Sequence, residues 1–281
     1  MQQLLSLLPE PEAILDGIPC YSPALAVENT YFDNGTLEMM ARAEQHSWWY
    51  KSRNQLIGYL VATYSKRPDT LFLEFGCGNG SVIGYLRQRF PGFALGGIEL
   101  LLEGLKVIRQ RFPGIETVQM DVFHLPAQEI CDAAGMFDVL EHLDDDEAAM
   151  RSVYAALRPG GHFYLSVPQH PWLYSRFDRK VGHRSRYTRR EMLDKLQRNG
   201  FQVVRVTGSN FFLLPLLFVK RQLDRYLVNP NQKVDIARLM HTGSVSNFLF
   251  GAIMRLEMAL IRLGISLPAG GSLVVVARKP N

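Results

Sequence analysis

Residues 71 to 81 read LFLEFGCGNGS, a run of five residues that is apolar except for Glu74, followed at once by a turn with three glycines. The run, Leu71 to Phe75, has the length and composition of a buried strand, and the segment after Gly80 has helical spacing. Glycines in the turn allow positive φ and let the backbone approach a ligand lying across the strand end. This stretch predicts the first strand–turn–helix unit of a parallel α/β sheet.

Further short apolar runs follow, and helix-length segments separate the first five of the predicted strands. The expected strands are residues 71–75, 94–99, 117–120, 133–137, 162–168, 201–207 and 273–277. This alternation indicates βαβ units and a sheet covered by helices on both faces. Ahead of the sheet, residues 36–64 have helical spacing and carry Trp48, Trp49 and Tyr50. We predict an N-terminal helical cap, 1–66, and an α/β domain, 67–281.

A long segment between the last two strands, about 208–271, is rich in Leu, Phe, Met and Arg and has helical periodicity. It predicts a helical insertion. Its role stays open between a substrate lid, a dimer surface, a helix lying on a membrane surface and additional core helices. The nine-residue run Phe211 to Val219, followed by Lys220 and Arg221, favours either a buried lid helix or an interfacial element.

The composition is that of an ordinary globular protein, with 281 residues of which 47% are hydrophobic and 21% charged. This excludes disordered and collagen-like classes. The net charge of +4 is too small to indicate a nucleic-acid-binding protein. The three cysteines are far apart, which excludes a disulfide framework and favours a cytoplasmic location. We expect no export signal, because the N-terminus lacks a basic region, and no membrane-spanning helix.

Acidic residues follow the next two predicted strands. Glu99 lies 23 residues after Gly76, where a carboxylate can accept hydrogen bonds from a ribose. Asp121 follows the third strand, where it can accept from an adenine amino group while Val122 covers the ring. Either acid alone could be an ordinary surface residue. A dinucleotide fingerprint would place glycine at position 81, where this chain has Ser81, so the pattern disfavours NAD.

In this order, LEFGCGNG, GIEL, QMDV, FDVLEHL and LRPGGHFYLSVP resemble the motif series of class I S-adenosylmethionine-dependent methyltransferases. The resemblance covers about residues 46–207. Within this class, the sequence is most similar to the small-molecule branch that includes ubiquinone-biosynthesis O-methyltransferases. Trp48-Trp49 and the stretch His183 to Tyr187 carry this similarity. The resemblance implies a Rossmann-like sheet of seven strands whose last strand is antiparallel.

The resemblance also implies a cofactor site for S-adenosylmethionine. The glycine turn would surround the methionine part, Glu99 the ribose and Asp121 the adenine, while Phe137-Asp138 would pass beneath the sulfonium. Arg53 would meet the cofactor carboxylate, although a solvent-exposed helix arginine is an equal alternative. The expected cofactor-binding residues are Arg53, Glu74, Gly76, Cys77, Gly78, Gly80, Glu99, Leu100, Asp121, Val122, Phe137 and Asp138.

Two ionisable side chains, Glu141 and His142, follow the fourth strand and are candidates to remove a proton from a hydroxyl acceptor. Equally, they could cap and orient the next helix. In ubiquinone-pathway and small-RNA methyltransferases, a similar Glu-x-x-Glu-His pattern with a later His can bind a divalent ion. Here Asp138 replaces the first Glu, and His170 or His183 would be the later ligand. A carboxylate-rich site would suit Mg²⁺, so this ion is a possible cofactor.

Residues 176–190 contain seven Lys or Arg and one acid. Arginine pairs well with phosphate and carboxylate groups, so an anionic acceptor is expected near this segment. We expect His183 and Tyr187 to take part in catalysis, and Trp49, His170 and Arg186 to contact the acceptor.

The sequence predicts an enzyme that methylates a small molecule, with a hydroxyl on an anionic or lipid-linked acceptor preferred. No DNA partner is expected. The alternatives are an RNA methyltransferase, which the lack of an RNA-binding appendage disfavours, and a non-catalytic module that binds the cofactor or a partner protein. Contact with a membrane surface and the oligomeric state stay open.

Overall fold

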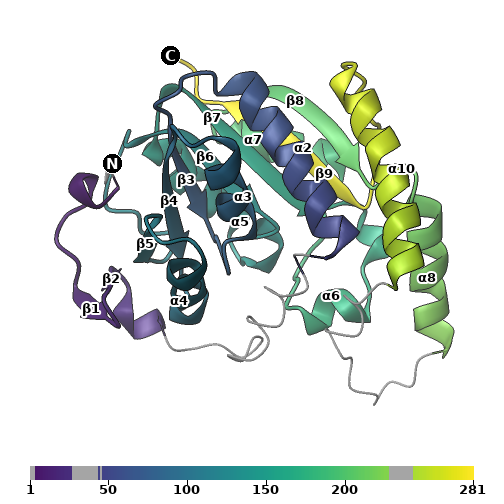
Figure 1. Ribbon diagram of the computed structural model, residues 1–281, viewed down its shortest axis with the longest axis horizontal. Helices are drawn as coiled ribbons and strands as arrows, with labels where there is room; N and C mark the ends of the chain where they lie inside the picture. Colours follow the sequence, from purple (N-terminus) through teal and green to yellow (C-terminus); the bar gives the residue numbers. More distant parts are fainter. Residues whose placement is uncertain (1–3, 27–43, 45, 228–242) are drawn as a thin grey trace.

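A computed structural model describes residues 4–26, 44, 46–227 and 243–281 of the chain and contains a twisted sheet of nine strands between layers of helices (Figure 1). Its strand order is β1-β2-β5-β4-β3-β6-β7-β9-β8. The strands are β1 (Ala13–Leu15), β2 (Ile18–Cys20), β3 (Leu71–Phe75), β4 (Ala94–Glu99), β5 (Glu116–Gln119), β6 (Cys131–Phe137), β7 (Leu157–Pro168), β8 (Gln202–Ser209) and β9 (Ser272–Arg278).

The seven strands from β3 to β9 confirm the predicted α/β class. Neighbours among β5, β4, β3, β6 and β7 are parallel, whereas β9 pairs antiparallel with both β7 and β8. The implied antiparallel last strand is therefore present. The carboxyl ends of the parallel strands meet at one edge of the sheet, where the glycine turn, Glu99 and the residues after β6 come together.

Helices cover both faces of the sheet. They are α2 (Trp48–Tyr64), α3 (Ser81–Arg89), α4 (Leu102–Arg111), α5 (Asp146–Ala156), α6 (Arg176–Lys180), α7 (Arg189–Arg198), α8 (Leu214–Leu227) and α10 (Ser244–Arg262). Because side chains alternate across a strand, Leu273 and Val275 of β9 pack with α5 and α7, whereas Val274 and Val276 pack with α2, α3 and α10. The sheet is thus buried on both faces, as parallel sheets require.

An N-terminal hairpin extends the sheet from the expected seven strands to nine, and it departs from a purely helical cap over 1–66. Strands β1 and β2 pair antiparallel across a turn at Asp16 and Gly17, which have φ values of 50° and 75°. Two successive positive φ values are those of a type I′ hairpin turn. β2 then pairs with β5 through Cys20 and Gln119. The hairpin therefore covers the edge that β5 would otherwise expose.

The helix expected over residues 36–64 is described from Trp48 to Tyr64, and residues 27–43 and 45 of that prediction lie outside the described part. α2 packs on α3 and on α10. Trp48 N donates a hydrogen bond to Asn247 Oδ1 (3.1 Å), and the rings of Trp48 and Phe250 meet edge to face at 5.4 Å. The N-terminal helix is therefore attached to the connection between β8 and β9.

That connection contains helices α8 and α10, with residues 228–242 outside the described part. The Glu257 carboxylate of α10 is buried and accepts hydrogen bonds from the backbone N–H groups of Asn210 and Phe211, both at 2.7 Å. These groups precede α8, so Glu257 fixes the start of α8 against α10. Within the described residues, every helix is too short or too polar to cross a bilayer.

Candidate functional site

The glycine turn after β3 has the backbone conformation that its sequence requires. Gly76, Gly78 and Gly80 have φ values of 71°, 53° and 83°. A Cβ at Gly76 would lie 2.5 Å from Val139 Cγ2, whereas a Cβ at Gly78 would meet no atom within 4 Å. Gly76 is needed for close packing, and Gly78 borders open space in which a ligand can lie against the backbone.

Glu99 at the end of β4 ties the glycine turn to the start of α4. Its Oε2 accepts a hydrogen bond from Gly78 N (2.8 Å), and its Oε1 accepts from Leu100 N (2.8 Å) and Leu101 N (3.1 Å). Burial raises the pKa of Glu99, and the three N–H donors oppose this shift. A carboxylate oxygen can accept more than one hydrogen bond, so Glu99 retains capacity for ribose hydroxyls.

Three further predicted cofactor residues lie at this edge: Cys77 in the glycine turn, and Asp121 and Val122 after β5. Cys77 is buried, and its Sγ would lie 2.8 Å from a Cβ at Gly97 of β4, so the thiol fills space beneath the turn. Asp121 Oδ1 accepts from Phe123 N (3.1 Å), and Val122 is buried beside it. Both residues follow β5, next to β4 in the sheet. The acids of successive strands therefore lie along one edge, as predicted.

Glu74, the acid that precedes the turn, is buried within β3. Its Oε2 has no hydrogen-bond partner, and burial raises its pKa to about 8, against the opposing effect of the Arg53 charge. A buried carboxyl without a partner is costly unless it is protonated or meets a cation. Glu74 is therefore suited to receive a positively charged ligand group.

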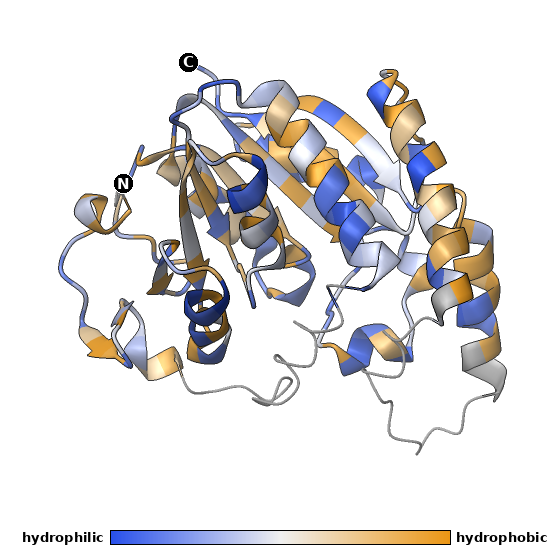
Figure 2. Ribbon diagram, in the orientation of Figure 1, coloured by the Kyte–Doolittle hydropathy of each residue, from blue (hydrophilic) through white to orange (hydrophobic). Residues whose placement is uncertain are grey.

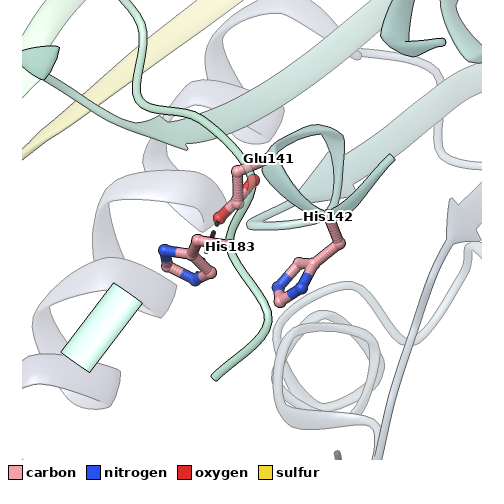
Figure 3. Close-up of side chains that lie close together, drawn as sticks. All are labelled: Glu141, His142 and His183. Atoms are coloured by element: carbon pink, nitrogen blue, oxygen red, sulfur yellow. Dashed lines mark ion pairs between the residues drawn. The ribbon is translucent and has the colours of Figure 1, made fainter. Parts of the chain in front are cut away.

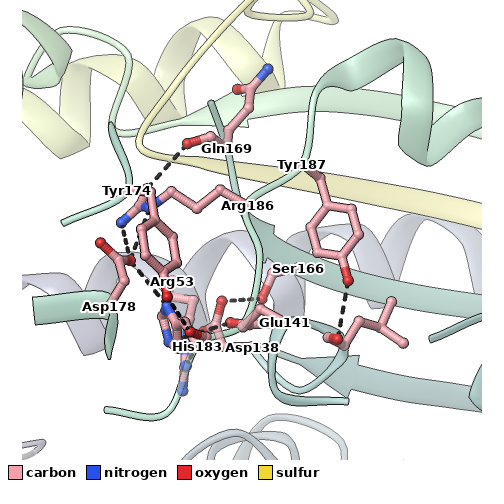
Figure 4. A network of polar contacts seen from close by, with 11 residues as sticks. Arg53, Asp138, Glu141, Ser166, Gln169, Tyr174, Asp178, His183, Arg186 and Tyr187 are labelled. Carbon is pink, nitrogen blue, oxygen red and sulfur yellow. Dashed lines mark hydrogen bonds and ion pairs between the residues drawn. The ribbon is translucent and has the colours of Figure 1, made fainter. Parts of the chain in front are cut away.

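Arg53 of α2 is not the solvent-exposed helix arginine that was one alternative, because only 14% of its side chain is exposed. Its Nη1 donates to Asp138 Oδ2 at 2.7 Å (Figure 4). Its guanidinium lies 4.8 Å from the ring centre of Trp49. Asp138 also accepts a hydrogen bond from Ser166 Oγ of β7 (3.1 Å). The pair joins α2 to the carboxyl ends of two strands.

Asp138 has a φ of 57°, which is uncommon for a residue other than glycine. Asp tolerates this region better than most residues, and strain of this kind is found at functional sites. Phe137, just before it at the end of β6, is buried. The conformation turns the Asp138 carboxylate toward Arg53 and Ser166.

Glu141, His142 and His183 form a cluster directly after β6 (Figure 3). One potential ligand atom from each lies within 4.8 Å of the others. The His183 Nε2 lies 3.8 Å from Glu141 Oε1, and the two imidazole rings meet edge to face at 4.8 Å. Of the two candidate later histidines, the structure brings His183 and not His170 to this cluster.

Burial controls the protonation of this cluster. Glu141 is fully buried, and neither carboxylate oxygen has a hydrogen-bond partner. Burial, reinforced by the nearby Asp138 charge, raises the pKa of Glu141 well above its usual value. Burial and the neighbouring His183 lower the pKa of His142 to about 4. His142 is therefore neutral at neutral pH.

Asp178 of α6 is a member of the site that the sequence interpretation missed. Its Oδ1 lies 3.1 Å from His183 Nδ1 and accepts from Arg186 Nε at 2.9 Å (Figure 4). Its Oδ2 accepts from Ser175 N and Ser175 Oγ, both at 2.8 Å. The His183 and Arg186 partners hold the pKa of Asp178 well below its usual range, against the effect of burial. Asp178 is thus an ionised carboxylate that orients His183.

Arg186, predicted to contact the acceptor, is engaged within the protein. Besides Asp178, its Nη1 donates to Gln169 O at 3.1 Å, and the residue is buried. The dense basic sequence of 176–190 therefore does not present all of its charges to a ligand. Arg184 differs, because its side chain is half exposed and its partner Asp144 is exposed as well.

Tyr187 and His170 lie beside the cluster but not in it. The buried Tyr187 hydroxyl lies 2.8 Å from Asp146 Oδ2 and 3.0 Å from Leu140 O, on the far side of the segment that carries Glu141. These contacts indicate a structural role for Tyr187, whose hydroxyl is held by groups of the protein itself. His170 stacks on Trp172 with ring centres 4.9 Å apart, and its Nε2 is buried without a hydrogen-bond partner. Burial lowers the pKa of His170.

Comparison with known proteins agrees with this arrangement. Residues 37–206, more than half of the chain, match a family model described as a methyltransferase domain. A trans-aconitate 2-methyltransferase of Paracidovorax citrulli is 32% identical over 98 residues, which are 34% of this chain and 38% of that protein. A ubiquinone biosynthesis O-methyltransferase of Bordetella avium is 30% identical over 103 residues, 34% of this chain and 41% of that protein.

A solved structure shares the fold at low sequence identity. It is phosphoethanolamine N-methyltransferase 2 of Haemonchus contortus, in complex with phosphomonomethylethanolamine and S-adenosylhomocysteine. The TM-score is 0.58 at 14% identity, over 90% of this chain and 59% of that one. The match to the two curated relatives spans about two fifths of their length.

Proposed function

The chain belongs to the methyltransferase-domain family, within the class I S-adenosylmethionine-dependent methyltransferases, and from this premise we propose that it methylates a hydroxyl group of a small anionic or lipid-linked molecule. The observation that carries the proposal is the arrangement of Asp178, His183 and Glu141 at the carboxyl end of β6. It places an oriented imidazole beside the predicted cofactor site.

The carboxyl edge of the sheet holds the cofactor in this proposal. Glu74 and the glycine turn contact its charged methionine part, Glu99 the ribose, and Asp121 with Val122 the adenine. Cys77 and Leu100 support these contacts through the backbone. The open space at Gly78 and the Glu74 Oε2 atom, which has no hydrogen-bond partner, support this assignment. When bound, S-adenosylmethionine supplies an electrophilic methyl group whose transfer breaks the carbon–sulfur bond.

His183 is the general base. Because the Asp178 carboxylate accepts from Nδ1, the Nε2 atom of His183 keeps its lone pair and can take the proton of an acceptor hydroxyl. Loss of this proton would make the hydroxyl oxygen a better nucleophile for the methyl group that bound S-adenosylmethionine would supply, and the Asp178 carboxylate would balance the positive charge on the imidazole. His142 stays neutral and bounds the acceptor space. Trp49 and His170 contact the acceptor from its other sides.

The acceptor is anionic in this proposal, and Arg184 is the residue that meets it. Its ion pair with Asp144 is exposed, and such pairs contribute only about 0–1 kcal/mol, so an acceptor carboxylate or phosphate can replace Asp144. Arg186 acts differently, as a positioning residue that holds Asp178. Trans-aconitate, named for one relative, is an anion, which supports this class of acceptor.

A magnesium ion does not fit the donor set that the structure presents. Glu141, His142 and His183 offer two imidazoles and one carboxylate, whereas Mg²⁺ prefers oxygen ligands in octahedral geometry. The fourth predicted ligand, Asp138, is paired with Arg53. We expect turnover to be unchanged when Mg²⁺ is removed with a chelator.

Binding of S-adenosylhomocysteine, measured by calorimetry with NADH as control, tests the cofactor assignment. We expect the nucleoside to bind and NADH not to bind. Glu99→Ala is expected to weaken binding at least roughly 10-fold, because it removes the ribose acceptor and three backbone hydrogen bonds. Glu103→Ala, at an exposed acid of α4, is the matched control and should leave the affinity unchanged. Equal binding by Glu99→Ala would contradict the assignment.

The base is tested by turnover on a panel of hydroxylated carboxylic acids and phosphate esters, scored by release of S-adenosylhomocysteine. With an accepted substrate, His183→Asn and Asp178→Asn should each lower kcat about 10²-fold or more. Cofactor affinity should be retained in both variants, so the loss should appear in kcat. Asp144→Asn, at an exposed acid, is the control and should change KM rather than kcat. Unchanged kcat in His183→Asn would refute the proposed base.

A further inference from the structure

Helix α8 carries a row of large apolar side chains that face solvent. Leu216, Val219 and Leu223 are each about half exposed, and Phe212, two residues before the helix, is exposed as well. Their spacing of four, three and four residues places them on one side of the helix. We call this row the α8 apolar face.

Helix α10 carries a second such row. Val245, Phe248, Leu249, Leu256 and Leu263 have exposed fractions of 52–79%. Their spacing of three, one, seven and seven residues again follows one side of the helix. We call this row the α10 apolar face. The opposite side of α10, with Met254, Met258 and Ile261, is buried against the domain, so the exposed row is not needed for the core.

The two apolar faces belong to one end of the molecule. Figure 1 shows α8 and α10 together at the end that lies beyond β8 and β9, and Figure 2 shows apolar residues along both helices. The hydrogen bonds from Asn210 N and Phe211 N to Glu257 join the start of α8 to α10. Single exposed apolar residues are common on protein surfaces, whereas contiguous rows mark interaction sites.

Basic residues border both rows. Among the side chains described on α8 and α10, the exposed charged ones are Lys220, Arg255 and Arg262. Lys220 lies four residues after Leu216, and Arg255 and Arg262 lie seven residues apart along one flank of the α10 apolar face. Helices that lie on membranes combine an apolar face with flanking Lys and Arg, which reach the lipid phosphates.

We propose that the α8 and α10 apolar faces bind together to the surface of a bilayer that contains anionic lipids. The apolar rows enter the boundary between headgroups and acyl chains, and Lys220, Arg255 and Arg262 meet the phosphates. A symmetric dimer through this surface is less favourable, because a two-fold axis brings the same basic residues into the interface from both copies. The proposal stands independently of the acceptor proposed above.

Trp172 supplies a natural reporter for this surface. It is half exposed, and its ring meets Phe218 of α8 edge to face at 5.5 Å. Tryptophan is enriched where proteins meet the interfacial region of membranes. Its emission should therefore shift to shorter wavelength when α8 enters a bilayer, and Trp172→Phe should reduce that shift without abolishing binding.

The test is co-sedimentation of the full chain with phosphatidylcholine vesicles, with and without phosphatidylglycerol. We expect binding to the anionic vesicles to be roughly 10- to 100-fold tighter, since Lys220, Arg255 and Arg262 would meet anionic headgroups. The double variant Arg255→Gln/Arg262→Gln should lose most of this preference. Arg190→Gln, at a fully exposed arginine of α7, is the matched control and should keep it.

The apolar contribution is tested by Phe248→Ser/Leu249→Ser, which should weaken vesicle binding at least roughly 10-fold. Ile14→Ser, at an exposed residue of β1, is the control and should bind as the wild type does. Circular dichroism and S-adenosylhomocysteine affinity establish folding, and Leu256→Ser is the second variant if the double one misfolds.

Two results would overturn the proposal. One is a wild-type chain that fails to sediment with anionic vesicles, or variants that sediment equally well. The other is a dimer in lipid-free solution that Phe248→Ser/Leu249→Ser dissociates, since the surface would then be an interface between copies.

Discussion

Buried carboxyl groups dominate the chemistry of single residues in this protein. Glu74 and Glu141 lie where water cannot solvate a charge; Glu74 Oε2 and both carboxylate oxygens of Glu141 have no hydrogen-bond partner. Such groups are costly in the ionised form, so the folded state holds their protons to higher pH than the unfolded state does. Their protonation is thereby linked to folding.

Glu74→Gln should change how stability depends on pH. The pKa of Glu74 is about 8 in the folded chain against 4.5 unfolded, so its favourable contribution is complete below pH 4.5 and is lost as pH rises toward 8. The variant removes this loss, of about 1 kcal/mol per pH unit. In thermal unfolding between pH 5 and 8, the stability of Glu74→Gln relative to the wild type should increase with pH. The stability of Glu103→Gln should depend on pH as that of the wild type does.

Asp178 shows what a sequence alone could not reveal about the site. It is the single acid among seven basic residues in 176–190, and that majority suggested an anion-binding segment. The fold instead buries Asp178 between His183 and Arg186, so it neutralises charge locally and orients an imidazole. A local signal existed, because Ser175 and Asp178 have the spacing of a capping box, but the long-range contacts are set by packing.

At the scale of elements, the close approach of α4 to the glycine turn is a point where one methyl group should matter. A Cβ at Gly104 would lie 2.4 Å from Gly78 O, a backbone atom that cannot turn aside. Gly104→Ala should therefore destabilise the protein by about 1–3 kcal/mol and weaken S-adenosylhomocysteine binding, since the turn must move.

Gly251→Ala is the matched substitution, because a Cβ there meets only the end of Arg255 at 3.8 Å. Alanine is more favourable than glycine in a helix interior, so the free energy of unfolding of this variant should increase by about 0.5–1 kcal/mol. Thermal unfolding and calorimetry of the two variants measure both effects. Equal stabilities would show that α4 can move away from Gly78 at little cost.

The strands from β3 to β9 could be predicted because each combines an apolar run with a turn signal, and most observed limits fall within two residues of the predicted ones. The hairpin of β1 and β2 was missed because each strand has three residues, too few for a periodicity. Asp16-Gly17 between Leu15 and Ile18 was a signal for it, since that dipeptide favours a type I′ turn. Its place beside β5 depends on long-range pairing.

For the whole molecule, cofactor binding should appear as resistance to heat. A ligand present at 100 times its Kd that binds only the folded state adds about 2.7 kcal/mol. For a chain of this size that corresponds to a rise in Tm of about 5–10 °C. Differential scanning fluorimetry with S-adenosylhomocysteine measures it. NADH should give no rise, and Glu99→Ala should give a smaller one at the same ligand concentration.

Helix α2 contacts α10 through Trp48 and the cofactor edge through Arg53, five residues later. Asn247 of α10 and Asp138 at the end of β6, 109 residues apart in the chain, therefore contact the same helix. Substitutions at Asn247 or Phe250 in α10 can thus shift the position of Arg53 and Asp138 while leaving every residue of the site in place. In evolutionary terms, the connection between β8 and β9 is a location where acceptor preference can diverge without mutation of the residues proposed to be catalytic.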